Sequence, residues 1–125
     1  MDQYQLDKLL SRVEKPARYI GNEWNMVQKT DAAFRFALCF PDVYEIGMSH
    51  QGSRILYNIL NGLDEVYCER CYCPWTDMER ALREDNLPLF TLETKSPLAA
   101  FDVVGFSMLY EMCYTNVLTM LDLGG

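Results

Sequence analysis

The clearest fold signal in the sequence is FRFALCFPDVYEIGMSHQGSRILYNILNG, residues 34–62. Its first seven residues are mostly apolar and rich in β-forming side chains, which predicts a buried strand that ends at Pro41. Residues 49–62 then predict a helix, with Ser49 as N-cap and Gly62 as the C-terminal stop. The helix face expected to be buried consists of Ile55, Leu56, Ile59, Leu60 and Leu63. A strand followed by a helix is the first half of a βαβ unit.

The rest of the chain continues this alternation. Residues 65–73 predict a second strand, and TDME at 76–79 matches a capping box that opens a second helix. Residues 101–108 predict a third strand and residues 114–123 a third helix, whereas PLFTLE at 88–93 predicts a short extra strand. We therefore expect an α/β fold with a small, mostly parallel sheet in the strand order 2-1-3 and helices on both faces.

The chain divides into two parts on this interpretation. Residues 1–30 form an N-terminal helix, within 4–13, and an extended arm held to the domain by Tyr19, Ile20 and Trp24; residues 31–125 form the α/β domain. An almost wholly apolar last helix and a sheet of only three strands indicate a domain truncated at its C-terminus. The exposed sheet edge is expected to allow pairing with a second copy.

Composition excludes several function classes. The 125 residues carry a net charge of −7, with no dense Lys/Arg stripe, which argues against direct nucleic-acid binding. The N-terminus MDQYQLDKLL lacks the apolar core of a signal peptide, and the longest apolar run is too short to cross a membrane. We expect a cytoplasmic protein whose five cysteines are reduced.

Five runs of the sequence, taken together and in order, resemble one family. They are KPARYIGNEWN (15–25), FPDVYEIGMSHQGSRILYNILN (40–61), CPWTDME (73–79), PLFTLET (88–94) and FDVVGFSMLYEMCYTNVLTMLDL (101–123). The set is similar to the N-terminal region of cobalamin-binding-type radical SAM proteins, often labelled Fe–S oxidoreductases. The resemblance implies a three-layer Rossmann-like domain of the flavodoxin or cobalamin-domain type, from about Leu6 to the last residue.

The resemblance also implies a radical SAM barrel as partner within the same polypeptide. Such a barrel holds a [4Fe–4S] cluster on C-x₃-C-x₂-C and cleaves S-adenosylmethionine. That motif is absent from this sequence, so the cluster and S-adenosylmethionine are expected only in the barrel. The domain formed by this sequence is then expected to be non-catalytic, and the cofactor that it could bind is cobalamin. The substrate of the whole protein is not indicated.

Three cysteines lie close together in VYCERCYCPW, residues 66–75. Because side chains alternate along a strand, Cys71 and Cys73 share one face and Cys68 lies on the other. One tetrahedral metal could not then be bound by all three thiolates. The resemblance implies small apolar residues in place of Cys71 and Cys73, so we interpret the cysteines as structural.

His50 is the only histidine, and it follows the first predicted strand. Cobalamin domains that use a histidine as lower cobalt ligand carry D-x-H-x-x-G at this point, but here Met48 stands at the Asp position and Gly52 comes one residue early. The carboxylate that would orient the imidazole is therefore missing. A polar role at the helix start and another kind of ligand contact are the alternatives.

The best candidate surface joins the loop at 41–52 to the segment at 107–116. In open α/β sheets ligands bind at the carboxyl ends of strands near the topological switch point, which lies between strands one and three in the order 2-1-3. The candidate cofactor-binding residues are Asp42, Tyr44, Glu45, Gly47, Ser49, His50, Gly52, Ser107, Tyr110 and Glu111. The alternative is a plain connection packed by Tyr44 and Met48.

Two functions follow from these observations. In the first, the domain holds a corrinoid over the cluster of the barrel. In the second, it keeps the fold without the cofactor and acts as a docking or substrate-positioning module. A deep groove between strands one and three would favour the first function, and a filled space there would favour the second. Dinucleotide, P-loop and nucleophile-elbow motifs are absent.

Overall fold

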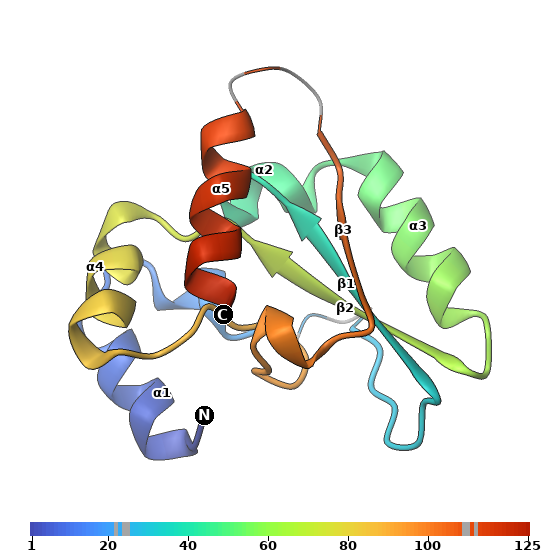
Figure 1. The fold of residues 1–125 in the computed structure, drawn as a ribbon, viewed down its shortest axis with the longest axis horizontal. Coiled ribbons are helices and arrows are strands. Elements are labelled where there is room, and N and C mark those ends of the chain that lie inside the picture. Colours follow the sequence, from blue (N-terminus) through green and yellow to red (C-terminus); the bar gives the residue numbers. More distant parts are fainter. Residues whose placement is uncertain (22, 24–25, 109–110, 112) are drawn as a thin grey trace.

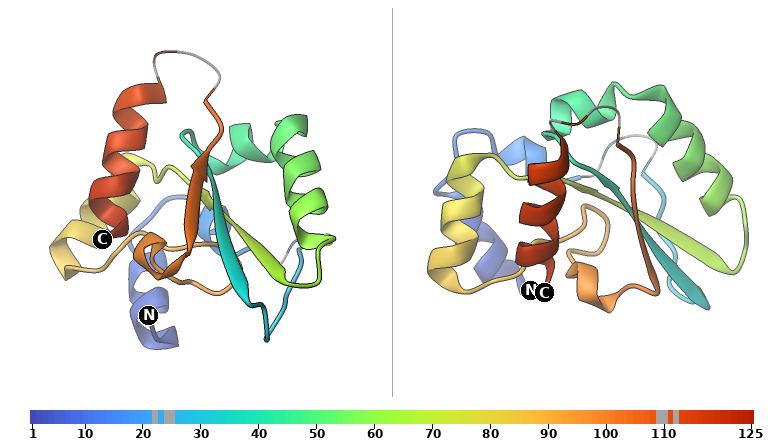
Figure 2. Two further views of the ribbon diagram at one scale, coloured as in Figure 1. Left: turned by 45° about the vertical axis from the view of Figure 1, so that its right-hand side comes forward. Right: turned by 45° about the horizontal axis from the view of Figure 1, so that its top comes forward.

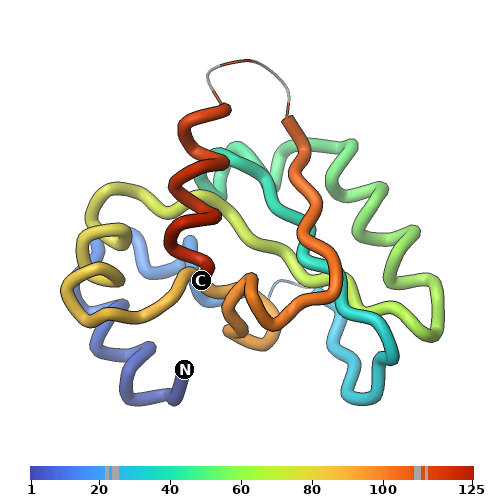
Figure 3. The backbone as a smooth tube through the Cα atoms, in the orientation of Figure 1, coloured from blue at the N-terminus to red at the C-terminus, as the bar shows by residue number. Residues whose placement is uncertain are grey.

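The computed structural model describes residues 1–21, 23, 26–108, 111 and 113–125. Figures 1 and 3 show the path of the chain, which alternates strands with helices after a short N-terminal helix. The elements are α1 (Gln3–Leu10), η1 (Pro16–Tyr19), β1 (Phe34–Phe40), α2 (Tyr44–Met48), α3 (Gln51–Asn61), β2 (Val66–Tyr72), α4 (Thr76–Asp85), η2 (Leu98–Ala100), β3 (Val103–Phe106) and α5 (Cys113–Gly124).

The sheet is parallel and has the order β2-β1-β3, as the sequence predicts. Cys39 in the central strand stands opposite Cys71 of β2 and Phe106 of β3. The outer edge of β2 is covered, because the backbone nitrogen of Leu92 donates to the carbonyl of Arg70 at 2.9 Å. Residues 88–93 make this contact without forming the predicted extra strand; only an isolated bridge joins Phe90 to Pro97.

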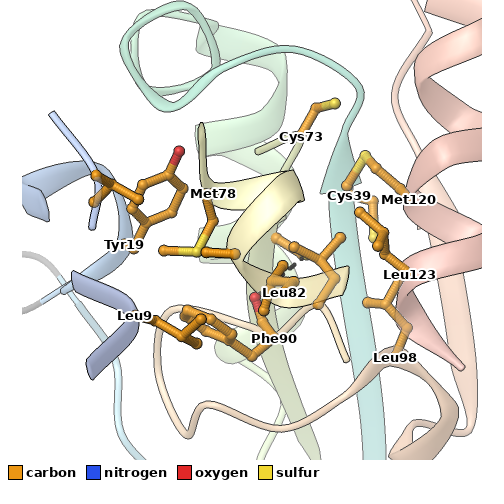
Figure 4. Packing of buried hydrophobic residues seen from close by; sticks show 14 of the residues in the cluster. Leu9, Tyr19, Cys39, Cys73, Met78, Leu82, Phe90, Leu98, Met120 and Leu123 are labelled. Carbon is orange, nitrogen blue, oxygen red and sulfur yellow. Dashed lines mark hydrogen bonds between the residues drawn. The ribbon is translucent and has the colours of Figure 1, made fainter. Parts of the chain in front are cut away.

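Helices cover both faces of the sheet. Figure 2 shows α3 on one face and α1, α4 and α5 on the other. The larger apolar cluster lies under α4 and α5 and includes Met78, Leu82 and Met120; Figure 4 shows Met120 beside Cys39 and Met78 near Tyr19. A smaller cluster of Leu38, Tyr57 and Cys68 lies under α3. This division confirms that Cys68 faces away from Cys71 and Cys73.

The prediction for the start of α3 was wrong by one residue. His50, not Ser49, is the N-cap, and its imidazole accepts a hydrogen bond from the backbone of Ser53. Ser49 instead ends α2, a short helix within the stretch predicted as a loop. The polar side chain with the right reach was the histidine, which can act as an acceptor at Nδ1.

The predicted buried face of α3 was also wrong. Ser53 and Tyr57 point to the sheet, with Leu60 partly buried, and four of the five predicted core residues face outward. These exposed residues are Ile55, Leu56, Ile59 and Leu63. The Tyr57 hydroxyl explains the orientation, because it accepts from the Val27 backbone at 2.8 Å and donates to Glu93 at 3.1 Å.

Two further details concern α4 and the arm. Trp75 is the N-cap of α4 and Thr76 the first helical residue, so the predicted capping box does not form. Tyr19 is buried as expected, and its hydroxyl accepts from the Trp75 backbone at 3.1 Å. Trp24, the other aromatic predicted to hold the arm to the domain, lies outside the described residues.

Within the described part of the chain, each helix is too short or too polar to cross a membrane.

Candidate functional site

Hydrogen bonds join the loops that follow the carboxyl ends of the three strands. Asn116 at the start of α5 donates to the carbonyl of Pro41 at 2.9 Å, and the backbone of Cys73 donates to the carbonyl of Asp42 at 2.9 Å. The backbone of Ser107 donates to the carbonyl of Cys39, also at 2.9 Å. The segments after β1, β2 and β3 therefore lie next to one another at the carboxyl edge of the sheet, where the site is predicted.

A hollow of about 170 Å³ opens at this edge between the loops after β1 and β2. Its walls include Asp42, Cys73, Trp75, Glu79, Asn116 and Thr119. Trp75 stands 50% exposed at the rim. The guanidinium of Arg18 lies 5.5 Å from the centre of the Trp75 ring and pairs with Glu45 at 2.8 Å, which fixes it over the ring. The rim thus carries the Trp75 ring and the carboxylates of Asp42 and Glu79, of which Glu79 pairs with Arg83 at 3.1 Å.

The predicted site residues in α2 serve the packing of the domain. The Tyr44 hydroxyl donates to Glu23 at 2.5 Å, and burial raises the pKa of Tyr44 well above its usual value. Gly47 allows a close approach, but to protein: a Cβ there would lie 2.1 Å from Cε1 of Tyr72. Ser49 donates to the carbonyl of Glu45 at 3.0 Å. Tyr44, Gly47 and Ser49 are thus all engaged in contacts within the domain.

His50 is engaged through Nδ1, which lies 3.1 Å from the Ser53 nitrogen and 2.8 Å from the Ser53 hydroxyl. An Nδ1 that accepts the backbone N–H carries no proton, so the neutral ring carries its proton on Nε2. Cobalt coordination through Nε2 would require the opposite tautomer and would leave the Ser53 N–H without its cap. A Cβ on Gly52 would lie 2.9 Å from Cε1 of His50, so the ring also packs on the helix start. These residues do not fit a corrinoid held by His50.

The space between β1 and β3 on the α3 face is filled by an aromatic ring. A Cβ added to Gly105 would lie 2.8 Å from Cζ of Phe36, so the Phe36 ring rests directly on the glycine backbone. Phe36 and Val103 are register partners in this pair of strands. In the described residues, the Phe36 ring therefore occupies the space over Gly105 on this face of the sheet.

A second, smaller cavity of about 40 Å³ lies under α3 and has the volume of about one water molecule. It is bounded by Leu38, Met48, Ser53, Tyr57, Arg70 and Tyr72, among others. Arg70 pairs with Glu93 at 2.6 Å and with Glu23 at 2.7 Å. Burial raises the pKa of Glu93, whereas the hydrogen bonds from Arg70 and Tyr44 outweigh burial at Glu23 and lower its pKa. This network joins the arm, β2 and the loop after α4.

The cysteines have the character of core residues. Burial raises the pKa of Cys68 and of Cys73 to about 12, and the neighbouring Cys39 thiol and burial raise that of Cys71. A thiol that stays protonated is a poor metal ligand and a poor nucleophile. Within the described part of the chain, no three or more His, Cys, Asp or Glu side chains are arranged to hold a metal ion.

The structure describes only some of the residues after β3. Ser107 is half-buried at the end of β3, Glu111 is exposed near the start of α5, and Tyr110 lies outside the described residues. Sequence reasoning missed Trp75 and Arg70. The rule that ligands and partners bind at carboxyl ends applies equally to β2, and CPWTDME directly follows that strand, so Trp75 could have been found.

Comparison with known proteins identifies the family. A profile described as the N-terminal region of radical SAM proteins matches residues 52–125, which is more than half of the chain. No curated protein and no solved structure shows significant similarity to the chain. The matched residues run from the start of α3 to the end of α5 and so include β2, β3 and Trp75, whereas Asp42 and Val43 on the other wall of the hollow lie outside the match. The chain belongs to the family of radical SAM N-terminal domains.

Proposed function

We propose that this domain is a non-catalytic docking and positioning module of a radical SAM protein. The observation that carries the proposal is Trp75, half exposed beside the hollow at the carboxyl edge with Arg18 over its ring. Tryptophan and arginine are enriched among the side chains that dominate the energy of protein–protein contacts. The N-cap position and the bond from its backbone to Tyr19 hold Trp75 in place before any partner arrives.

The partner in this proposal is the radical SAM barrel of the same polypeptide, which carries the [4Fe–4S] cluster and S-adenosylmethionine. The rim of the hollow has carboxylates at Asp42 and Glu79. Complementary charge favours a barrel surface with an apolar side chain for the hollow and Lys or Arg around it. A hollow of about 170 Å³ holds one such side chain and is smaller than the roughly 300–1,000 Å³ of typical cofactor and ligand sites.

Corrinoid binding is the competing function, because the strand order and the family resemblance are of the cobalamin-domain type. Two observations support docking instead. The His50 imidazole caps α3, and the Phe36 ring fills the space over Gly105. The domain would then keep the architecture of a cobalamin domain while its former cofactor face stabilises the fold.

Calorimetric titration of this domain into the separately produced barrel tests the proposal. Trp75→Ala should weaken binding by about 30-fold or more, since loss of a central anchor costs roughly 2 kcal/mol. Tyr4→Ala is the matched control, because Tyr4 is a 77% exposed aromatic on α1, remote from the carboxyl edge. Absence of binding by the unaltered domain, or equal binding by the Trp75 variant, would contradict the docking role.

A further inference from the structure

The sulfur of Met48, the last residue of α2, accepts hydrogen bonds from two strong donors. The guanidinium of Arg70 donates through Nη1 at 3.3 Å, and the hydroxyl of Tyr72 donates at 3.4 Å. Both donors belong to β2, whereas Met48 reaches them from the short helix that follows β1. A thioether is a weak acceptor. An oxygen atom at this point would be a better partner for both donors, and above all for the cation.

Other contacts hold both donors in place. Arg70 is 8% exposed, and its Nε and Nη2 atoms pair with Glu93 at 2.6 Å and with Glu23 at 2.7 Å. The Tyr72 ring lies directly on Gly47, where a Cβ would come within 2.1 Å of it. Burial raises the pKa of Tyr72 to about 12, so its hydroxyl keeps the proton that it donates. The two donors are therefore preorganised around the sulfur.

The cavity of about 40 Å³ under α3 adjoins this contact. Met48, Arg70 and Tyr72 all border it, and it has room for about one water molecule. One oxygen atom added to the sulfur therefore finds space beside the donors. Met48 is half-buried, in contrast to Met78 and Met120, which are fully buried in the larger apolar cluster. A small oxidant thus has access to Met48 while the domain stays folded.

We propose that Met48 is an oxidation site for hydrogen peroxide, and that the fold is preorganised to hold the resulting sulfoxide. A lone pair of the sulfur attacks one peroxide oxygen, so that the S–O bond forms as the O–O bond breaks. The proton of the transferred hydroxyl group passes to the departing hydroxide, which leaves as water. The sulfur loses two electrons and the peroxide gains them. The new oxygen then accepts hydrogen bonds from Arg70 and Tyr72.

The effect of this oxidation on stability differs from the usual one. A sulfoxide is polar, and in an apolar core it disrupts the packing. At Met48 the new oxygen replaces a weak acceptor by a strong one that bonds a buried cation, so oxidation should reinforce the contact between α2 and β2. The contact is separate from the hollow beside Trp75, and the proposal does not depend on the docking function proposed above.

Substitution of Met48 tests the proposal through stability. Glutamine mimics the sulfoxide, because its amide carbon and oxygen correspond to the sulfur and oxygen of the oxidised side chain. Met48→Gln should unfold at a urea concentration about 0.5 M higher than Met48→Leu, because leucine leaves both donors without an acceptor. In a Tyr72→Phe background this difference should shrink, since one donor is gone. Met78 is the matched control: in the apolar cluster, Met78→Gln should unfold at lower urea than Met78→Leu.

Oxidation of the chain itself provides a second readout. After treatment of the folded chain with hydrogen peroxide, peptide mass spectrometry should find Met48 as the sulfoxide while Met78 and Met120 stay reduced. The same treatment of the Met48→Leu variant measures the effect of the other methionines on the urea midpoint. Relative to that effect, oxidation of the unaltered chain should leave its midpoint unchanged or raise it.

Three outcomes would overturn the proposal. One is a Met48→Gln variant that is no more stable than Met48→Leu. Another is an advantage of glutamine over leucine that persists undiminished in the Tyr72→Phe background. The third is a folded chain in which Met48 stays reduced under peroxide, or whose midpoint falls further on oxidation than that of the Met48→Leu variant.

Discussion

The Nδ1 atom of His50 lies 3.1 Å from the backbone nitrogen of Ser53, which makes the single histidine of the chain the N-cap of α3. The imidazole therefore stabilises the start of the helix. The residue lies between α2 and α3, in the segment after the first strand where a cobalamin domain would place its lower ligand, yet its lone pair at Nδ1 points to the helix.

Two substitutions of His50 should show whether its contribution to stability comes from capping α3 or from another property of the imidazole. His50→Ala should lower the free energy of unfolding by about 1 kcal/mol, because the Ser53 N–H loses its acceptor. His50→Asp should retain most of that stability, since a carboxylate is a good N-cap. Urea unfolding followed by circular dichroism measures both. Equal losses in the two variants would contradict the capping role.

Removal of Arg70 should be among the most costly substitutions. Arg70→Met should lower the free energy of unfolding by about 3–5 kcal/mol, because it leaves Glu93 buried without its cation. Arg83→Met is the control: Arg83 pairs with Glu79 and Asp122 at the surface, where water screens the ion pairs, so its loss should change the stability far less than the loss of Arg70. Urea unfolding of both variants at pH 7 gives the comparison, and similar small losses would show that the buried network contributes little.

Gly47 should tolerate no larger residue while Tyr72 is present. Gly47→Ala places a Cβ 2.1 Å from the Tyr72 ring, which should cost on the order of 1–3 kcal/mol. In a Tyr72→Leu background the same change should cost less, because the ring is gone. A double-mutant cycle by chemical denaturation measures this coupling. Strict additivity of the two substitutions would refute the steric explanation.

The buried thiols predict how stability depends on alkaline pH. The pKa of Cys68 and of Cys73 rises from 9.0 in the unfolded chain to about 12 in the folded domain. The unfolded state therefore binds fewer protons between these values, and stability falls as pH rises from about 9 to 12, by about 1 kcal/mol per pH unit for each thiol.

Urea unfolding at pH 8 and pH 10 tests this dependence on the unaltered chain and on Cys68→Ala and Cys73→Ala. Each variant should be less stable at pH 8, but its stability should fall less steeply with pH than that of the unaltered chain. Parallel pH dependences in all three proteins would show that these thiols ionise equally in both states.

Much of the fold could be predicted because its signals are local. The apolar run at 34–40 and the alternation of strands and helices after it were sufficient for the parallel order β2-β1-β3. The orientation of α3 could not be predicted in this way. A Tyr57 hydroxyl can be buried only where the Val27 backbone and Glu93 meet it, and these partners are 30 and 36 positions away in the chain.

In the candidate site, too, the features with local sequence signals could be predicted, and those that depend on distant partners could not. Asp42 was predicted from its place after the first strand, and it borders the hollow. The pairing of Arg70 with Glu23, 47 positions away, left no local pattern to read. Strand alternation, in contrast, was enough to separate Cys68 from Cys71 and Cys73, because that rule depends only on the backbone.

Titration of the chain with hydroxocobalamin tests directly whether the His50 imidazole caps α3 instead of binding a corrinoid. We expect an unchanged corrinoid absorption spectrum and complete separation of corrinoid from protein on desalting. Stoichiometric retention of corrinoid, with a spectral shift that disappears in the His50→Asp variant while its helix content stays intact, would contradict it.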